Sequence, residues 1–257
     1  MTLSLRLWRR HKADKSHSTV SSIPTFKRIL LKLSGESLGG KKGQGFDPEV
    51  LSSIATELRE LTQLGVSIGI VVGGGNFFRG LSSGLPGCDR VDADRIGMLA
   101  TVMNGLAIKA ALTDKGVPAE VYSAFTIDGA AQTFKRQAVL EFMNSGAVAI
   151  FSGGTGNPLF TTDSAASLRA VEINAELLIK ATRVDGVYDS DPEKNPDATR
   201  FSSLSFDEVL DRKLSVMDMT AFVLCQENQL PIRVLDLNKR EALKNAVMGL
   251  DEGTLIS

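Results

Sequence analysis

Short runs of aliphatic residues alternate along this chain with longer stretches in which apolar residues recur every three or four positions. Beginning at Phe26, six short runs have the length and the Val, Ile and Leu content of buried strands. They are residues 29–33, 66–72, 119–122, 147–151, 177–181 and 232–236. Apolar strands separated by helices are typical of parallel sheets covered on both faces. The pattern therefore predicts an α/β fold, a three-layer α/β/α sandwich with a mostly parallel central sheet.

The clearest helix begins at Asp47, a favourable N-cap residue that precedes Pro48, and ends before Gly65. Its apolar residues fall on one face, so we interpret them as core positions that pack on the sheet. Further helices are predicted for residues 93–115, 132–144, 163–174, 218–228 and 239–247.

The composition is that of a globular protein, with 43% hydrophobic and 23% charged residues among 257. The 29 basic and 30 acidic side chains nearly balance, which argues against a nucleic-acid-binding protein and favours a small ligand. We find no uninterrupted apolar run of about 18 residues, so we expect no membrane span. A cytoplasmic location is a separate expectation.

Histidine and cysteine are scarce in ways that limit the chemistry. Both histidines, His11 and His17, lie at the beginning of the chain, and Cys88 and Cys225 fit no metal-binding spacing. Triads that depend on imidazole and His-rich zinc sites are therefore excluded from the rest of the chain. The two cysteines indicate a reducing compartment without a disulfide framework.

Residues 1–25 differ in composition from the rest of the chain, with five basic side chains against one acidic side chain, Asp14. We expect a basic, poorly ordered extension that precedes a single domain over residues 26–257. An organellar transit peptide is the alternative interpretation, since the segment is rich in Arg and Ser.

Glycine clusters follow three of the predicted strands: Ser34-Gly35, Gly73-Gly74-Gly75 and Gly153-Gly154. The carboxyl ends of parallel strands meet at one edge of a sheet, where ligands bind. Glycine lets backbone N–H groups approach phosphate oxygens closely. With Lys32 and Arg79 beside two of the clusters, the pattern predicts a site for phosphorylated ligands.

Two common phosphate-binding motifs do not fit. Residues 35–42 read GESLGGKK, in which Lys42 replaces the Ser or Thr that a P-loop needs for Mg²⁺. Residues 73–78 read GGGNFF and lack the dinucleotide fingerprint, which argues against a nicotinamide-dependent oxidoreductase.

Phosphoryl transfer needs no imidazole, because it depends mainly on alignment and on neutralising the charge of the transferred group. Lys32 is suitably placed for that neutralisation. Asp163, at the start of a predicted helix, is a candidate for orienting such a lysine or holding Mg²⁺, and a plain helix cap is the other interpretation.

Seven segments in order give the chain a specific family resemblance: KRILLKLSGE (27–36), VVGGGNFFRG (71–80), GMLATVMNGLA (97–107), GTGNPLFTTDSAA (154–166), KATRVDGVYDSDP (180–192), VMDMTAF (216–222) and the terminal GTLIS. With these segments the chain resembles the bacterial uridylate kinases of the amino acid kinase superfamily, from about Phe26 to Ser257. GTGNP followed by FTTDSAA separates this group from relatives that act on carbamate, aspartate or glutamate.

The resemblance implies transfer of the γ-phosphoryl group of ATP to UMP in pyrimidine biosynthesis, with the N-terminal part binding mainly UMP and the C-terminal part mainly ATP. The implied catalytic residues are Lys32, Lys180, Asp163 and Asp218, the two aspartates organising the lysines and the Mg²⁺ that accompanies ATP. No side-chain cluster of metal ligands is expected. The implied ATP contacts are Lys32, Leu33, Ser34, Gly35, Gly75, Arg79, Thr182, Tyr188 and Asp191.

The implied UMP contacts are Gly74, Asp94, Thr155, Gly156, Asn157, Pro158, Leu159, Phe160, Thr161 and Thr162. The resemblance also implies activation by GTP at Gly40, Lys41, Lys42, Gly43, Gln44 and Gly45, inhibition by UTP, and a homohexamer.

Arg183 departs from the family pattern, which more often has lysine there, and replaces a point charge by a planar donor. Two alternative functions stay open at this point: a kinase for another small acid, and a noncatalytic nucleotide-binding regulator.

Overall fold

The computed structural model describes residues 23–80, 85–192 and 194–257. The expected extension over residues 1–25 therefore lies almost entirely outside the described residues. At Thr25 the chain is already bonded to the domain, since its N–H donates to Val247 O and its hydroxyl donates to Met248 O.

Nine strands form one sheet in the order β4-β3-β5-β2-β1-β6-β8-β9-β7. Every pair is parallel except β8 with β9, so the predicted mostly parallel α/β sheet is confirmed. The strands are β1 (Arg28–Leu33), β2 (Ser67–Val72), β3 (Ala119–Ser123), β4 (Gln132–Thr133), β5 (Val148–Ser152), β6 (Leu177–Thr182), β7 (Ser203–Leu204), β8 (Ile232–Asp236) and β9 (Thr254–Ile256).

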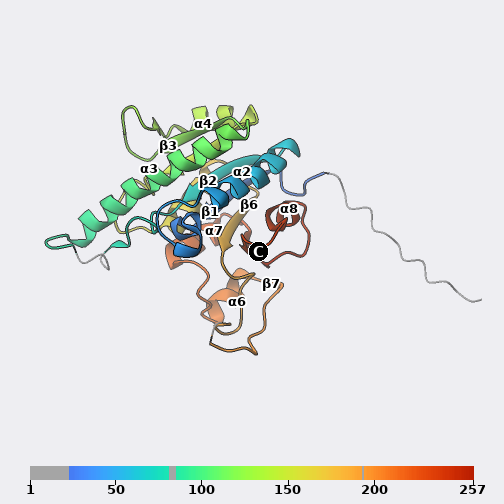
Figure 1. Ribbon diagram of the computed structural model, residues 1–257. Helices are drawn as coiled ribbons and strands as arrows, with labels where there is room; N and C mark the ends of the chain where they lie inside the picture. The colour runs from blue at the N-terminus through green and yellow to red at the C-terminus, as the bar shows by residue number, and fades with distance from the viewer. Residues whose placement is uncertain (1–22, 81–84, 193) are drawn as a thin grey trace, which may run out of the picture.

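Two hydrophobic cores, one on each side of the sheet, make the three layers. One core joins the sheet to α2 (Pro48–Gln63), α3 (Arg90–Asp114) and α8 (Ala242–Val247). The other joins it to α4 (Arg136–Asn144), α5 (Thr162–Glu172), α6 (Phe206–Asp211) and α7 (Met219–Glu227). In Figure 1, α3 and α4 lie toward one end of the molecule and α6 toward the other, as the strand order requires.

Alternation along β1 decides where its lysine points. Ile29, Leu31 and Leu33 pack in the core with α2, whereas Leu30 packs in the core with α5. Successive side chains of a strand point to opposite faces, so Lys32 projects to the same face as Leu30. The sheet thus directs this lysine toward α5.

The six predicted strands are confirmed, each with ends within one residue of the prediction. The prediction of a helix over residues 132–144 was wrong at its start, because Gln132 and Thr133 pair with β3 and α4 begins only at Arg136. The last predicted helix begins at Ala242, since Glu241 adopts a left-handed conformation (φ 63°) that α-helix cannot continue. Strands β4, β7 and β9 and the helices α1 (Gly35–Leu38) and α6 were not predicted.

Helix α3 is long and apolar enough to cross a membrane by length and composition alone, which the sequence analysis did not anticipate. It packs instead against α2, β3 and β5. Part of its apolar surface stays exposed, at Ile96, Leu99, Met103 and Leu106. We therefore interpret α3 as a core helix with an exposed apolar edge.

Candidate active site

Two lysines stand side by side at the carboxyl ends of the central strands. Lys32 of β1 and Lys180 of β6 are partners in the parallel register of these strands. Leu178 packs in the same core as Leu30, so alternation directs Lys180 to the same face as Lys32. The sheet therefore brings together two cations that are far apart in sequence.

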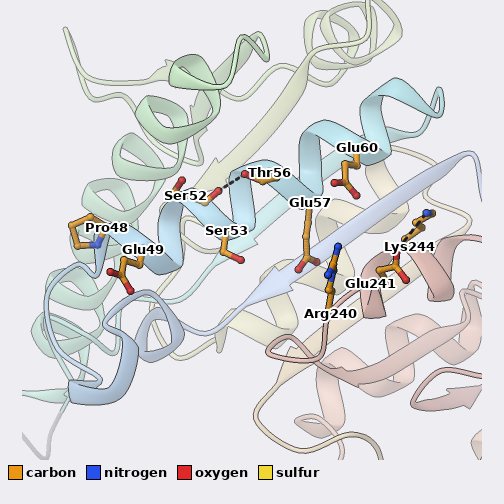
Figure 2. Close-up of a pocket in the computed structure, with 10 residues that line it drawn as sticks. All are labelled: Pro48, Glu49, Ser52, Ser53, Thr56, Glu57, Glu60, Arg240, Glu241 and Lys244. Carbon is orange, nitrogen blue, oxygen red and sulfur yellow. Dashed lines mark hydrogen bonds and ion pairs between the residues drawn. The ribbon is translucent and has the colours of Figure 1, made fainter.

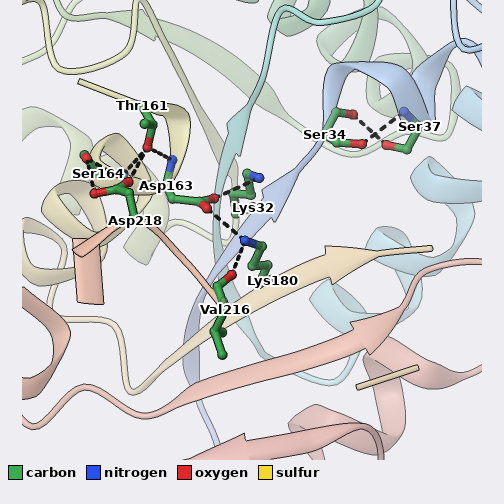
Figure 3. A network of polar contacts seen from close by, with 9 residues as sticks. All are labelled: Lys32, Ser34, Ser37, Thr161, Asp163, Ser164, Lys180, Val216 and Asp218. Carbon is green, nitrogen blue, oxygen red and sulfur yellow. Dashed lines mark hydrogen bonds and ion pairs between the residues drawn. The ribbon is translucent and has the colours of Figure 1, made fainter. Parts of the chain in front are cut away.

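Asp163, in the first turn of α5, lies between the two ammonium groups (Figure 3). Its Oδ1 is 2.8 Å from the Nζ of Lys32, and its Oδ2 is 2.8 Å from the Nζ of Lys180. Lys180 also donates to the carbonyl oxygen of Val216, in the segment before α7. One carboxylate thus contacts both lysines, and the catalytic role expected of Asp163 stays a prediction.

The electrostatics of this triad are set by burial and mutual contact. Burial by itself raises the pKa of the Asp163 carboxyl, but Lys32 and Lys180 outweigh it and lower the pKa below its usual value. Burial lowers the pKa of Lys180, and the proximity of Lys32 adds to that effect, although Asp163 opposes it. The carboxylate therefore keeps its charge and helps Lys180 to keep its own.

Asp218 ties the beginnings of α5 and α7 together (Figure 3). It caps α7 by accepting from the N–H of Ala221, and it accepts from the hydroxyls of Thr161 and Ser164. Thr161 in turn caps α5 by accepting from the N–H groups of Asp163 and Ser164. Asp218 thus acts on the triad through the position of α5, and its charge also favours the protonated form of Lys180.

The glycine clusters that follow β1 and β2 are in close contact. A Cβ atom on Gly35 would lie 2.7 Å from both the carbonyl oxygen of Gly73 and the N of Gly75. Ser34 caps the short helix α1 by accepting from the N–H of Ser37. A side chain at residue 35 would force these turns apart, so glycine is required there for close approach.

A cavity of about 280 Å³ opens beside these turns. Most of the expected UMP contacts line it, together with two residues expected near the ATP phosphates, Gly75 and Arg79. The lining also includes Arg90 and Thr101 of α3, which sequence reasoning did not single out. Two features of the sequence could have indicated these residues. Thr101 lies within the GMLATVMNGLA segment, and Arg90 precedes Asp94 by one helical turn.

The carboxylate of Asp94 already accepts hydrogen bonds from two parts of the chain. The Nε of Arg90 is 3.0 Å from both of its carboxylate oxygens, and the N–H of Leu159 donates to Oδ2 at 2.7 Å. Leu159 has φ 72°, a conformation that costs energy for a residue with a Cβ atom. Asp94 thus joins α3 to the loop that precedes α5.

A second cavity, of about 600 Å³, is lined in part by Lys180. Its lining contains Thr182, Tyr188 and Asp191, the expected contacts of the ATP base and ribose, and also Arg212 and Val216, which the sequence analysis did not name. The phenol of Tyr188 donates to Asp185, and this bond raises the pKa of the phenol. Arg183 is exposed and is not among the lining residues.

Some expected contacts lie outside both cavity linings. Leu33 is fully buried, so only its backbone is available to a ligand. Lys32, Ser34 and Gly35 lie at the end of β1, and Gly156, Pro158 and Leu159 belong to the loop before α5 without lining its cavity. The loop of residues 40–45 contains a 3-10 turn (Gly40–Lys42), with Lys41 and Lys42 exposed to solvent.

A further hollow, of about 690 Å³, lies between α2 and the segment that leads into α8, and none of the expected site residues is part of its lining (Figure 2). Glu57 and Arg240 point toward one another there, and Figure 2 marks no contact between them. Burial raises the pKa of Glu57 from 4.5 to about 7, and nearby Glu60 adds to the shift.

The paired lysines, the shared aspartate and the glycine turns on one sheet edge are groups that phosphoryl transfer can use to align and neutralise phosphates. Residues 27–236 match the Amino acid kinase family, and the chain belongs to this family. It is 54% identical over 233 residues to a protein of Pseudomonas putida named uridylate kinase, covering 91% of this chain and 94% of that relative.

Solved structures agree with the assignment of this chain to the Amino acid kinase family. The fold is similar to that of a UMP kinase from Bacillus anthracis, with a TM-score of 0.87, 35% identity, and coverage of 90% of this chain and 96% of that one. A UMP kinase from Ureaplasma parvum gives a TM-score of 0.85 and 35% identity, with coverage of 90% and 98%.

Proposed function

We propose that this protein is a UMP kinase that transfers the γ-phosphoryl group of ATP to UMP, giving ADP and UDP in pyrimidine nucleotide biosynthesis. The named relatives at 54% identity and the UMP kinase structures support this assignment. The observation that carries it is the Lys32–Asp163–Lys180 triad, which adjoins two cavities, one lined by Lys180 and the other lined by Thr162, the residue before Asp163.

We assign UMP to the cavity between α3 and the loop before α5, and ATP to the cavity between β6 and the segment before α7. Lys180 lines the second cavity, and Thr162, the residue before Asp163, lines the first. The triad therefore stands where the γ-phosphate of ATP and the phosphate of UMP would meet. This arrangement supports UMP binding mainly by the N-terminal part and ATP binding mainly by the C-terminal part of one domain, residues 26–257.

In this reaction an oxygen of the UMP phosphate attacks the γ-phosphorus of ATP, the bond from that phosphorus to the bridging oxygen breaks, and ADP leaves. Lys32 and Lys180 would neutralise the equatorial oxygens of the transferred group, because two ammonium groups beside it favour the transition state. Asp163 would hold both lysines in place, and Asp218 would hold the turn that carries Asp163.

We expect Mg²⁺ to enter this site bound to the phosphates of ATP. Among the residues that the structure describes, no group of three His, Cys, Asp or Glu side chains is arranged to hold a metal ion. Both oxygens of Asp163 already contact lysines. Mg²⁺ would supply additional charge neutralisation to the phosphates of ATP, with Asp163 and Asp218 as the nearest carboxylates of the triad region.

The UMP ribose is assigned to Asp94, whose carboxylate accepts hydrogen bonds and lines the first cavity. The phosphate of UMP is assigned to Gly74, Thr161, Thr162 and the backbone of the preceding loop. Arg79, whose Nη2 lies 3.1 Å from Glu36 Oε1, also lines this cavity.

We further propose that the chain assembles as a homohexamer in the cytoplasm, with GTP acting at residues 40–45 and UTP inhibiting. The exposed apolar residues of α3 support self-association, because Ile96, Leu99, Met103 and Leu106 follow the spacing of a helix-pairing stripe. The exposed Lys41 and Lys42 support the binding of an anionic effector such as GTP to the loop of residues 40–45.

An ADP-release assay with UMP, CMP, dUMP, carbamate and glutamate as acceptors tests the function. We expect ADP formation that depends on UMP and is much weaker with the other acceptors. Turnover with carbamate or glutamate instead would assign a small-acid kinase, and binding of ATP and UMP without ADP formation would assign a noncatalytic regulator.

A further inference from the structure

Two asparagines are buried behind the glycine turns, where the reaction as described does not use them. Asn76 follows the Gly73–Gly75 turn and is 4% exposed, and Asn104, in the middle of α3, is fully buried. An uncharged amide without partners is costly to bury. The partners of these two side chains therefore indicate what they do.

The two side chains form a closed amide pair. Asn76 Nδ2 donates to Asn104 Oδ1 at 2.9 Å, and Asn104 Nδ2 donates to Asn76 Oδ1 at 2.7 Å. Each amide then uses its other N–H outside the pair, Asn104 to Gly73 O at 2.6 Å and Asn76 to Gly45 O at 2.8 Å. Every donor is used and both oxygens are engaged, so the network is satisfied and rigid.

Three segments of the site converge on this pair. The Gly73 carbonyl belongs to the turn that approaches Gly35, and Asn76 Oδ1 is itself 2.6 Å from the place where a Gly35 Cβ would stand. Gly45, the last residue of the loop assigned to GTP, makes a second bond by donating its N–H to the backbone oxygen of Asn76. Asn104 lies one turn along α3 from Thr101, which lines the UMP cavity and accepts from the N–H of Gly153.

We propose that the Asn76–Asn104 pair positions the Gly73–Gly75 turn for the UMP phosphate and fastens the loop of residues 40–45 to that turn. The inference rests on the proposed kinase function. Neither asparagine is among the lining residues of the two cavities, and the pair acts by holding the Gly73 carbonyl and the Gly45 backbone, so that Gly74 and Gly75 keep their place in the lining of the UMP cavity. Displacement of Gly45 would therefore move the phosphate-binding turn.

The test compares UMP with uridine, which lacks only the phosphate, by calorimetric titration of the full chain. Asn104→Ala leaves Gly73 O and Asn76 Oδ1 without donors. We expect its affinity for UMP to fall about 10- to 100-fold, the usual effect of losing buried hydrogen bonds, and its affinity for uridine to change less than about 3-fold. Amide hydrogen exchange at Gly45 should accelerate in the same variant, because the hydrogen bonds between Gly45 and Asn76 become weaker.

Asn245→Ala is the matched control, since Asn245 is a half-buried asparagine of α8 that bonds Glu252 far from the site. The double variant Asn76→Ala/Asn104→Ala should bind UMP little more weakly than either single variant, because the pair acts as one unit. If Asn104→Ala does not fold, Asn104→Ser, which keeps one donor, takes its place with a smaller expected loss.

Equal losses of UMP and uridine affinity would assign the pair a general structural role and overturn the proposal. Unchanged UMP affinity together with unchanged exchange at Gly45 would also overturn it. Absence of UMP phosphorylation by the unmodified protein would refute the kinase function instead, and the exchange at Gly45 would still decide whether the pair fastens the loop.

Discussion

Replacement of Asp163 by asparagine tests the central feature of the site. The substitution keeps the shape of the side chain but removes the charge that lies 2.8 Å from each lysine ammonium. The three side chains are only 13–16% exposed, so solvent screens these pairs weakly. Removing one partner of a buried ion pair costs about 3–5 kcal/mol of stability.

The effect on catalysis follows from misplacement of the lysines. Without the carboxylate, Lys32 and Lys180 repel one another and lose their common anchor. The loss of one preorganised electrostatic contact lowers kcat by about 100- to 1,000-fold, or roughly 2.7–4 kcal/mol. The KM for UMP should change less than about 3-fold, because the acceptor cavity keeps its lining.

The pH profile gives a second readout. Burial and Lys32 already lower the pKa of Lys180, and Asp163 opposes them. In Asp163→Asn the pKa of Lys180 should fall further, so the decline of kcat on the alkaline side should begin at lower pH than in the unmodified protein.

Steady-state ADP release across pH, with urea unfolding of the same samples, measures these effects. Asp114→Asn at the exposed end of α3, where the side chain is 75% exposed, is the control and should change neither kcat nor stability appreciably. A kcat within about 3-fold of the unmodified value in a folded Asp163→Asn variant would refute the assigned role.

Three further predictions address other residues. Lys32→Ala should lower kcat by about 100- to 1,000-fold, equivalent to roughly 3–4 kcal/mol, with little change in UMP binding, and ADP-release kinetics should show this; near-normal kcat with a much raised KM for UMP would contradict the role. UMP should be preferred over dUMP by about 10- to 150-fold, and Asp94→Ala should reduce that ratio of kcat/KM by weakening UMP alone, whereas an unchanged ratio would remove Asp94 from the ribose site. Glu57, with its pKa raised from 4.5 to about 7, destabilises the fold as pH rises through that interval, because the native state disfavours the charged carboxylate. Glu57→Gln should therefore stabilise the protein by about 1–2 kcal/mol at pH 8 and hardly at pH 4 in urea unfolding, and equal effects at both pH values would argue against the shift.

Much of the fold was predictable because its signals are local. The runs of Val, Ile and Leu specified the six long strands, and the Asp47-Pro48 cap specified the beginning of α2. The glycine clusters could be assigned to strand ends for the same reason, and they lie at the sheet edge where ligands bind. By contrast, two- and three-residue strands such as β4 and β9 carry no periodicity of their own, and they form because a neighbouring strand offers unpaired backbone groups.

The site itself was only partly predictable. The sequence alone indicated Lys32 and, as one of two interpretations, Asp163, whereas Lys180 and Asp218 rested on the family resemblance. That Lys32 and Lys180 stand together depends on the pairing of β1 with β6, and their common contact with Asp163 depends on how α5 packs over that face. The Asn76–Asn104 pair is of the same kind, since nothing in either local sequence shows that two buried amides will satisfy one another. Local composition thus determined the elements and the chemistry on offer, and tertiary packing decided which side chains share a charge or a hydrogen bond, because those contacts join segments that meet only in the folded sheet.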